Sequence, residues 1–173
     1  MRVGVLALQG AFASHIRMLQ ALGQDAVEVR NPAELAAVDR LVMPGGESTT
    51  VSMLLETSGL LEPVAARLTD GMPVFGTCAG MILLACEIVD GRADQRALGA
   101  IDLQVRRNAF GRQVDSFETE LDVIGFDTPF PAVFIRAPIV EAAGPGVEIL
   151  ASVGDQPVLC LQRSTLVAAF HPE

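Results

Sequence analysis

The pentapeptide Gly76-Thr77-Cys78-Ala79-Gly80 lies between a short apolar run, Pro73-Val74-Phe75, and a longer one at residues 81–86. A strand, a glycine-flanked turn and a helix in this order are typical of a nucleophile elbow, here built around a cysteine. The glycines allow a sharp turn, and the first amides of the following helix favour a thiolate. A small buried cysteine at a strand end would fit the pentapeptide equally well. The choice between these interpretations depends on the rest of the chain.

Strand-like and helical segments alternate around this elbow. In the first half, predicted strands lie at residues 2–8, 25–29, 40–43 and 73–75, and predicted helices at 11–22, after Asn31-Pro32, and at 49–56, 60–68 and 81–86. Beyond residue 91, β-leaning runs follow one another more closely, at 101–106, 116–123, 133–135, 147–153, 158–161 and 166–170. This order predicts an α/β fold with a doubly wound mixed sheet flanked by helices, flavodoxin-like, with an antiparallel extension. No linker splits the chain, so we expect one domain over residues 1–173.

Composition and charge argue against several classes of protein. The net charge of −9 disfavours a nucleic-acid partner. No apolar stretch approaches the roughly 18 residues of a membrane span, and no secretion signal precedes the first strand, so we expect a cytoplasmic protein without membrane contact. The three cysteines lack the C-x-x-C spacing of zinc sites. We expect no metal and no cofactor, and we expect Cys86, within the helix after the elbow, and Cys160 to be inert packing residues.

The chain ends with Phe170-His171-Pro172-Glu173, directly after a predicted strand. Catalytic groups in open α/β sheets gather at the carboxyl ends of the strands, which is where the elbow also lies. Cys78 would be the nucleophile, His171 would take its proton, and Glu173 would orient the imidazole. A solvated histidine is the alternative, but the chain has only two histidines and this one lies where the elbow needs a base. The catalytic interpretation is therefore favoured. The other histidine, His15, is expected to be a solvated helix residue.

A third segment, Pro44-Gly45-Gly46-Glu47-Ser48-Thr49-Thr50, follows a predicted strand and opens a helix. The two glycines leave backbone amides unobstructed, as an oxyanion hole or a closely bound ligand requires. Ser48 and Thr49 are typical helix caps. We expect no capping role for Glu47, whose carboxylate would instead receive a substrate ammonium group.

Together these segments resemble one family. The carriers of the resemblance are Leu8-Gln9-Gly10-Ala11, the PGGESTT segment, residues 76–85 (GTCAGMILLA), residues 107–113 (RNAFGRQ), residues 134–138 (FIRAP) and the final FHPE. The chain is similar to the glutaminase subunit of pyridoxal 5′-phosphate synthase, a class I glutamine amidotransferase with a Cys-His-Glu triad. The resemblance implies hydrolysis of L-glutamine to glutamate and ammonia through a cysteine thioester.

The resemblance also implies roles for single residues. Cys78, His171 and Glu173 match the triad, and the substrate-binding positions match Gly46, Glu47, Ser48, Arg107, Ile135 and Arg136. A planar guanidinium suits an α-carboxylate, although both arginines could equally be solvated surface residues. The amides of Gly46 and Ala79 are expected to form the oxyanion hole. The resemblance implies a synthase subunit as partner in a hetero-oligomer, and Gln9 and Gly10, at the same sheet edge, are the expected contacts.

Two alternatives remain open. The chain could be a class I glutaminase of another pathway, from which the RNAFGRQ segment would distinguish it, or a catalytically silent partner-binding subunit. All three triad residue types are present, which disfavours the silent subunit.

Overall fold

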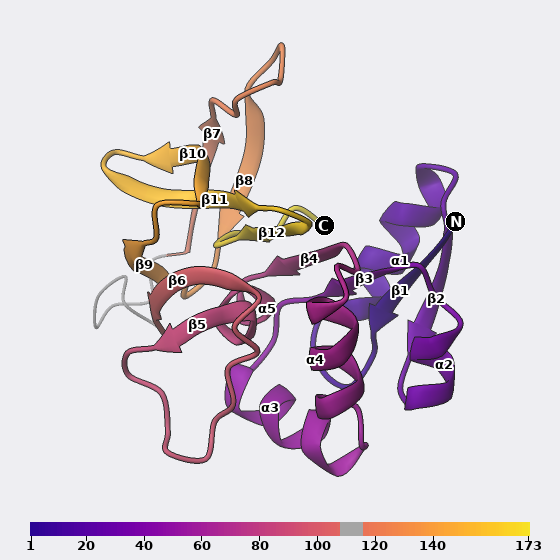
Figure 1. The fold of residues 1–173 in the computed structure, drawn as a ribbon. Helices are drawn as coiled ribbons and strands as arrows, with labels where there is room; N and C mark the ends of the chain where they lie inside the picture. Colours follow the sequence, from indigo (N-terminus) through magenta and orange to yellow (C-terminus); the bar gives the residue numbers. More distant parts are fainter. Residues whose placement is uncertain (108–115) are drawn as a thin grey trace.

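The computed structural model describes residues 1–107 and 116–173, and the sheet at its centre is seven-stranded (Figure 1). The strand order is β10-β11-β12-β4-β3-β1-β2. Five neighbouring strands are parallel: β12 (Thr165–Ala168), β4 (Val74–Thr77), β3 (Arg40–Met43), β1 (Arg2–Leu6) and β2 (Asp25–Val29). The hairpin of β10 (Glu148–Val153) and β11 (Gln156–Gln162) adds antiparallel strands at one edge. The predicted mixed sheet with an antiparallel extension is confirmed.

Residues 1–107 and 116–173 contain five helices. They are α1 (Phe12–Ala21), α2 (Pro32–Ala36), α3 (Ser48–Thr57), α4 (Leu61–Thr69) and α5 (Ala79–Leu84). Helix α1 covers one face, where Phe12, Ile16 and Leu19 pack on Val3, Val5 and Val42. The other helices contribute to the larger core on the opposite face. The helix start predicted at Asn31-Pro32 is present in α2. The Asn31 side chain accepts a hydrogen bond from Glu34 N (3.0 Å), and Pro32 occupies the first turn.

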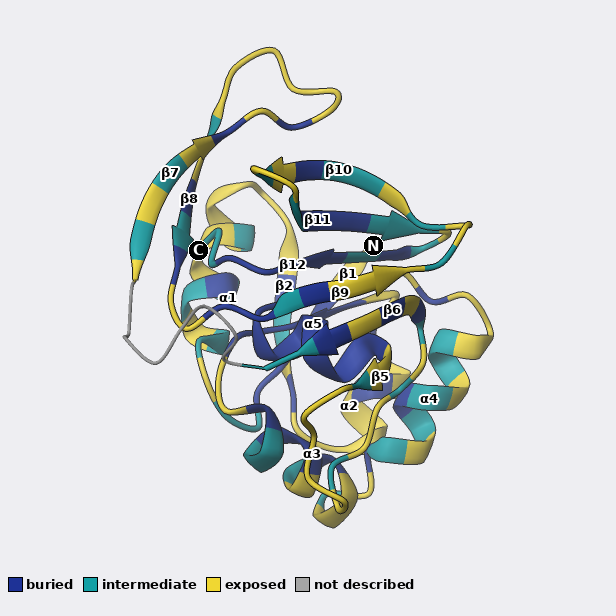
Figure 2. Cartoon of the chain, turned by 90° about the vertical axis from the view of Figure 1, so that its left-hand side faces the viewer, coloured by how far each residue is buried: buried dark blue, intermediate teal, exposed yellow. Residues whose placement is uncertain are grey.

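The second half of the chain builds two smaller sheets beside the central one (Figure 2). One contains β5 (Ala85–Ile88), β6 (Ile101–Arg106) and β9 (Ile139–Ala143), and the other is the hairpin of β7 (Phe117–Leu121) and β8 (Phe130–Phe134). The predicted helix after the elbow is too long. It ends at Leu84, and Cys86 lies exposed in β5 instead of inside a helix. Cys160 is buried as expected. Residues 108–113 of the RNAFGRQ segment lie outside the described residues.

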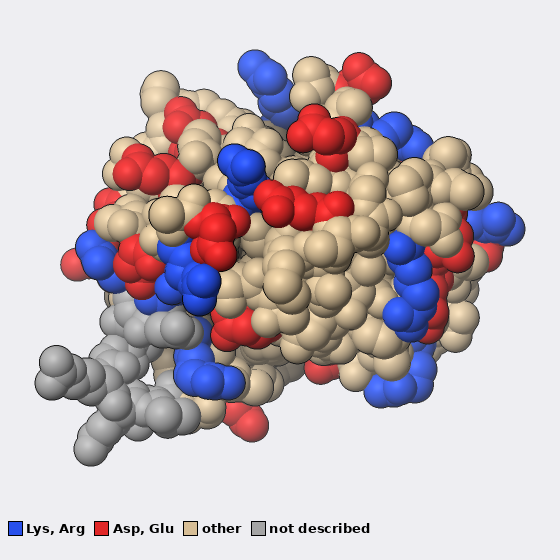
Figure 3. Space-filling view, turned by 90° about the horizontal axis from the view of Figure 1, so that it is seen from below, with Lys and Arg blue, Asp and Glu red and all other residues tan. Residues whose placement is uncertain are grey.

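The surface carries charges of both signs. On the face seen in Figure 3, arginines and acidic side chains are interspersed, which differs from the basic stripe typical of nucleic-acid-binding proteins. Among the helices of residues 1–107 and 116–173, none is long and apolar enough to cross a membrane.

Candidate active site

Cys78 occupies a strained turn between β4 and α5. Its φ is +49° and its ψ is −102°, a combination that residues with a side chain rarely adopt. The turn leaves no room for a Cβ at Gly80, where it would collide with the Met43 carbonyl, or at Gly76, where it would lie 2.8 Å from the carbonyl carbon of Gly80. The Cys78 amide donates to Ala168 O (2.8 Å), which fixes the elbow to β12. The predicted nucleophile-elbow geometry is therefore present.

His171 reaches the cysteine from the segment that follows β12. Its amide donates to Val133 O (2.8 Å), and its ring Nδ1 lies 3.0 Å from Glu173 Oε1. The hydrogen bond with Cys78 is the largest cause that raises the pKa of His171, to about 10, followed by the hydrogen bond with Glu173. Burial of the ring opposes both. The imidazolium, the form that results when His171 takes the Cys78 proton, is thus favoured.

Glu173 is nearly inaccessible, with 6% of its side chain exposed. Burial alone would raise the pKa of its carboxyl, but the hydrogen bond with His171 and the electrostatic effect of the nearby His15 ring together lower it. The carboxylate is therefore ionised beside His171, as an orienting group in a triad requires. The three side chains predicted as a triad lie together.

His15 does not lie where the sequence analysis expected it. The residue is 4% exposed, and its Nε2 lies 3.2 Å from Thr77 Oγ1 and 3.3 Å from Glu173 Oε2. The expectation of a solvated residue was wrong because it ignored the helical stripe. His15 lies three positions after Phe12 and four before Leu19, so it shares the face that packs on the sheet. That spacing was the available signal.

The loop after β3 packs directly against the loop after β1. Gln9 Oε1 accepts a hydrogen bond from Glu47 N (2.9 Å), and Gly45 O accepts one from Ala11 N (3.0 Å). A Cβ at Gly10 would collide with Gly45 O, and a Cβ at Gly46 would collide with Gln9 Oε1. Gln9, predicted only as a partner contact, thus also holds the Gly46–Glu47 peptide in place.

The capping assignment in this loop was also wrong. Glu47 is the N-cap of α3, and its Oε1 accepts hydrogen bonds from Thr49 Oγ1 (2.9 Å) and Thr49 N (3.3 Å). Ser48 lies in the first turn, 4% exposed, and its Oγ accepts a hydrogen bond from Gln95 Nε2 (3.0 Å). Glutamate is an uncommon cap, so the preference for Ser and Thr misled the prediction.

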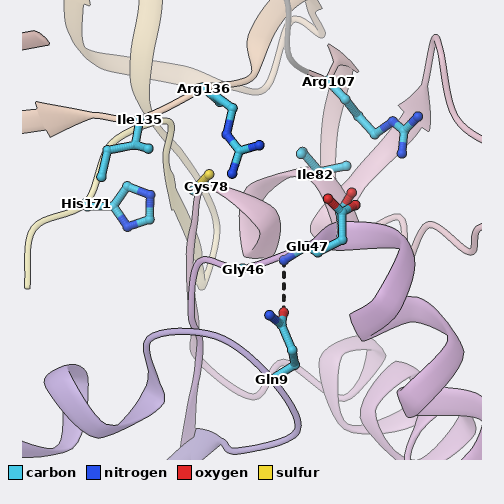
Figure 4. Close-up of a pocket in the computed structure, with 10 residues that line it drawn as sticks. Gln9, Gly46, Glu47, Cys78, Ile82, Arg107, Ile135, Arg136 and His171 are labelled. Atoms are coloured by element: carbon cyan, nitrogen blue, oxygen red, sulfur yellow. Dashed lines mark hydrogen bonds between the residues drawn. The ribbon is translucent and has the colours of Figure 1, made fainter. Parts of the chain in front are cut away.

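A pocket opens over the cysteine (Figure 4). It is lined by Gln9, Gly46, Glu47, Ser48, Cys78, Ile82, Arg107, Ile135, Arg136 and His171. All six predicted substrate-binding positions therefore line one pocket with Cys78 and His171. Ile82, from α5, is a lining residue that the sequence analysis missed; it belongs to the apolar run after the elbow. Among the described residues, no group of three or more His, Cys, Asp or Glu side chains could hold a metal ion.

The two arginines of the pocket differ in how they are held. The backbone amide of Arg107 donates a hydrogen bond to Asp90 Oδ1 (2.7 Å), and Arg107 Nη2 donates one to the backbone carbonyl of Asp90 (3.1 Å). Arg136 has a positive φ of +44°, and within residues 1–107 and 116–173 its guanidinium makes no hydrogen bond or ion pair. In Figure 4, the side chain of Arg136 extends toward Cys78. A free guanidinium and a carboxylate in one pocket complement the two charges of an α-amino acid.

Comparison with known proteins agrees with this geometry. The model of the SNO glutamine amidotransferase family matches residues 5–173. The chain belongs to this family. It is 59% identical to pyridoxal 5′-phosphate synthase subunit PdxT of Frankia alni, over 99% of this chain and 87% of that protein. It is 60% identical to the subunit of the same name from Mycobacteroides abscessus, over 99% of this chain and 89% of that protein.

Solved structures extend the comparison to the fold. A crystal structure of a glutamine amidotransferase superposes with a TM-score of 0.92 at 49% identity, covering 98% of this chain and 89% of the other. The structure of PurLQS from Thermotoga maritima superposes with a TM-score of 0.68 at 16% identity, covering 99% of this chain and 87% of that chain. The second similarity shows the fold alone. The first similarity shows that this family member has the fold of a glutamine amidotransferase.

Proposed function

We propose that this chain is the glutaminase subunit of a pyridoxal 5′-phosphate synthase. It hydrolyses the side-chain amide of L-glutamine to glutamate and ammonia, and it delivers the ammonia to a synthase subunit. The observation that supports the proposal is that Cys78 contacts His171 and His171 contacts Glu173, at a pocket lined by both acidic and basic side chains. The full-length similarity to PdxT subunits supports the pathway.

The reaction follows from the position of each group. The Cys78 sulfur attacks the carbonyl carbon of the glutamine side chain while His171 takes the thiol proton. The tetrahedral intermediate collapses to a γ-glutamyl thioester as His171 returns that proton to the departing nitrogen, which leaves as ammonia. A water molecule, deprotonated by His171, then attacks the thioester carbon. The C–S bond breaks, glutamate leaves, and the proton returns to the thiol. Glu173 orients the imidazole throughout.

The pocket supports binding of the charged end of glutamine. Arg136 is suited to the α-carboxylate because its guanidinium has no other partner among the described residues. Glu47 is suited to the α-ammonium group, although its carboxylate also caps α3. Arg107, Ser48 and Ile135 complete the lining. Substrate binding would thus use groups that do not take part in proton transfer.

The oxyanion formed during attack needs hydrogen-bond donors. We assign this role to the amides of Gly46, in the loop held by Gln9, and of Ala79, the residue after the nucleophile. We also propose that the synthase subunit contacts Gln9 and Gly10. Because Gln9 accepts from the amide of Glu47, such a contact would act on the peptide that includes Gly46.

The test is glutamate release from L-glutamine by the purified chain, with and without the synthase subunit. We expect low activity alone and a rise of at least about tenfold with the synthase, within the range that one aligned oxyanion donor contributes. Cys78→Ser in the same complex is the control for contaminating glutaminase. Release that the synthase does not increase would point to another pathway, and no release in the complex would point to a catalytically silent subunit.

A further inference from the structure

His15 is the buried residue of α1. The other residues on this face of the helix, Phe12, Ile16 and Leu19, are apolar and partly buried against the central sheet. Burying an imidazole at such a position costs free energy unless its ring nitrogens have hydrogen-bond partners. The partners of His15 therefore indicate why a histidine lies here.

Both partners of the ring belong to the active site. His15 Nε2 lies 3.2 Å from Oγ1 of Thr77, the fully buried residue that precedes the nucleophile. The same nitrogen lies 3.3 Å from Oε2 of Glu173. The other carboxylate oxygen, Oε1, lies 3.0 Å from Nδ1 of His171. Two imidazoles thus bracket one carboxylate from opposite sides.

The outer oxygen of Glu173 depends on this arrangement. Within residues 1–107 and 116–173, Oε2 is buried and makes no hydrogen bond of regular geometry, so His15 Nε2, at ion-pair distance, is the polar group that compensates it. A buried carboxylate oxygen without such a group is costly. Without His15, the carboxylate would gain by rotating away from His171 toward solvent.

We infer that His15 is a positioning residue of the triad, which holds Glu173 so that Oε1 faces His171; this inference rests on the proposed glutaminase function. A neutral ring with its proton on Nε2 suits this task, since it places a polar N–H group beside Oε2 (Nε2–Oε2 3.3 Å) without cancelling the negative charge that His171 needs. Burial lowers the pKa of His15, and the positive charge of His171 lowers it further, while Glu173 opposes both. His15 does not touch the reacting atoms.

The alternative is a purely structural role, in which His15 acts only through its contact with Thr77. In that case, substitutions at His15 would lower the stability of the fold but would leave kcat and the pKa of His171 unchanged in the molecules that remain folded. Two amide variants separate these roles. In His15→Gln the side-chain nitrogen reaches close to the position of Nε2, whereas in His15→Asn it reaches only the position of Nδ1. Both variants are polar and neutral, so they differ mainly in reach.

Ser52→Ala is the matched control. It removes another buried hydrogen bond, the one from Arg96 N to Ser52 Oγ (2.8 Å), far from Glu173.

Two measurements on these variants test the inference. The first is kcat for glutamate release in the complex with the synthase, below each variant's thermal transition. The second is NMR titration of the imidazole in the isolated chain. Since the chain has two histidines, the one that remains in each His15 variant is His171.

We expect His15→Asn to lower kcat by about 10- to 100-fold, as when groups that orient a functional side chain from behind are removed. The pKa of His171 should fall by about one unit or more, because the carboxylate no longer stabilises the imidazolium fully. His15→Gln should recover most of both values, and Ser52→Ala should change neither.

Two outcomes would overturn the inference. One is wild-type kcat and wild-type titration of His171 in folded His15→Asn. The other is equal behaviour of the Gln and Asn variants, with lower thermal stability as their shared effect. If the wild-type complex releases no glutamate, the proposed function fails, and the titration of His171 still tests whether His15 holds Glu173.

Discussion

Gly45→Ala should inactivate the enzyme although it replaces no residue of the triad. Gly45 is buried, and its φ is not positive, so alanine brings no backbone strain. The new Cβ, however, would lie well inside contact distance of His171 Cε1, 3.1 Å from Nδ1 of the same ring, and 3.4 Å from Cys78 Cβ. Because carbon atoms pack at about 3.5–4.0 Å, the ring would have to recede by about 1 Å.

His171 cannot move freely, since its amide is bonded to Val133 and its ring to Glu173. A displacement of about 1 Å in a reacting group costs about 10²-fold in rate, and overpacking a buried site costs about 1–3 kcal/mol of stability. The assay is kcat for glutamate release in the complex with the synthase, together with the thermal unfolding midpoint. Gly146→Ala is the control, because the Cβ there would meet only the end of the Gln162 side chain, at 3.0 Å. A folded Gly45→Ala enzyme with kcat within about threefold of wild type would refute the reasoning, because about 10²-fold is expected.

Three further predictions concern single groups. Cys78→Ser should abolish glutamine hydrolysis, and a glutamine-analogue label should appear on Cys78 by mass spectrometry but not on Cys160, where burial raises the pKa to about 11; label on Cys160 would contradict the assignment. Arg136→Gln should raise KM more than it lowers kcat, the signature of lost substrate binding, and an equal KM with reduced kcat would argue against that role. Because the pKa of His171 is raised from 6.5 to about 10, its contribution to stability is complete below pH 6.5 and is lost as the pH rises through 10. The unfolding midpoint should fall over this range less steeply in His171→Asn than in wild type, and identical slopes would refute the linkage.

The parts of this protein that could be predicted are those encoded by neighbouring residues. The elbow follows from glycines on both sides of Cys78, and the base and its carboxylate follow from the His-Pro-Glu that comes directly after a predicted strand. Parallel strands bring these separate segments to one sheet edge, so the constellation could be assembled before the contacts were known. The structure brings Cys78, His171 and Glu173 together at that edge.

The features that could not be predicted are contacts that single side chains make in the folded protein, and the exact end of one helix. The carboxylate of Glu47 turns back to cap its own helix, whereas capping preferences favour Ser48 or Thr49. The burial of His15 follows from its place on the apolar stripe, but its contact with Glu173 joins residues 158 positions apart. No local pattern reports a contact over that separation. Cys86 falls outside the helix because α5 ends at Leu84 and the chain continues as a strand.

The segment from Gln9 to His15 makes contacts with both the Gly46–Glu47 loop and the triad carboxylate. At its start, Gln9 holds the amide of Glu47 and so the loop that contributes Gly46 to the pocket. One helical turn into α1, His15 contacts the outer oxygen of Glu173. Between them, Gly10 is exposed and lies against Gly45, where a side chain would collide with the carbonyl. A synthase subunit that bound at Gly10 would therefore act on the loop of Gly46, which we propose to hold the oxyanion, and on the triad carboxylate through the same short segment. If the proposed contact at Gly10 forms, this connection would give a physical reason for the glutaminase to depend on its partner, since one contact would align both halves of the catalytic site.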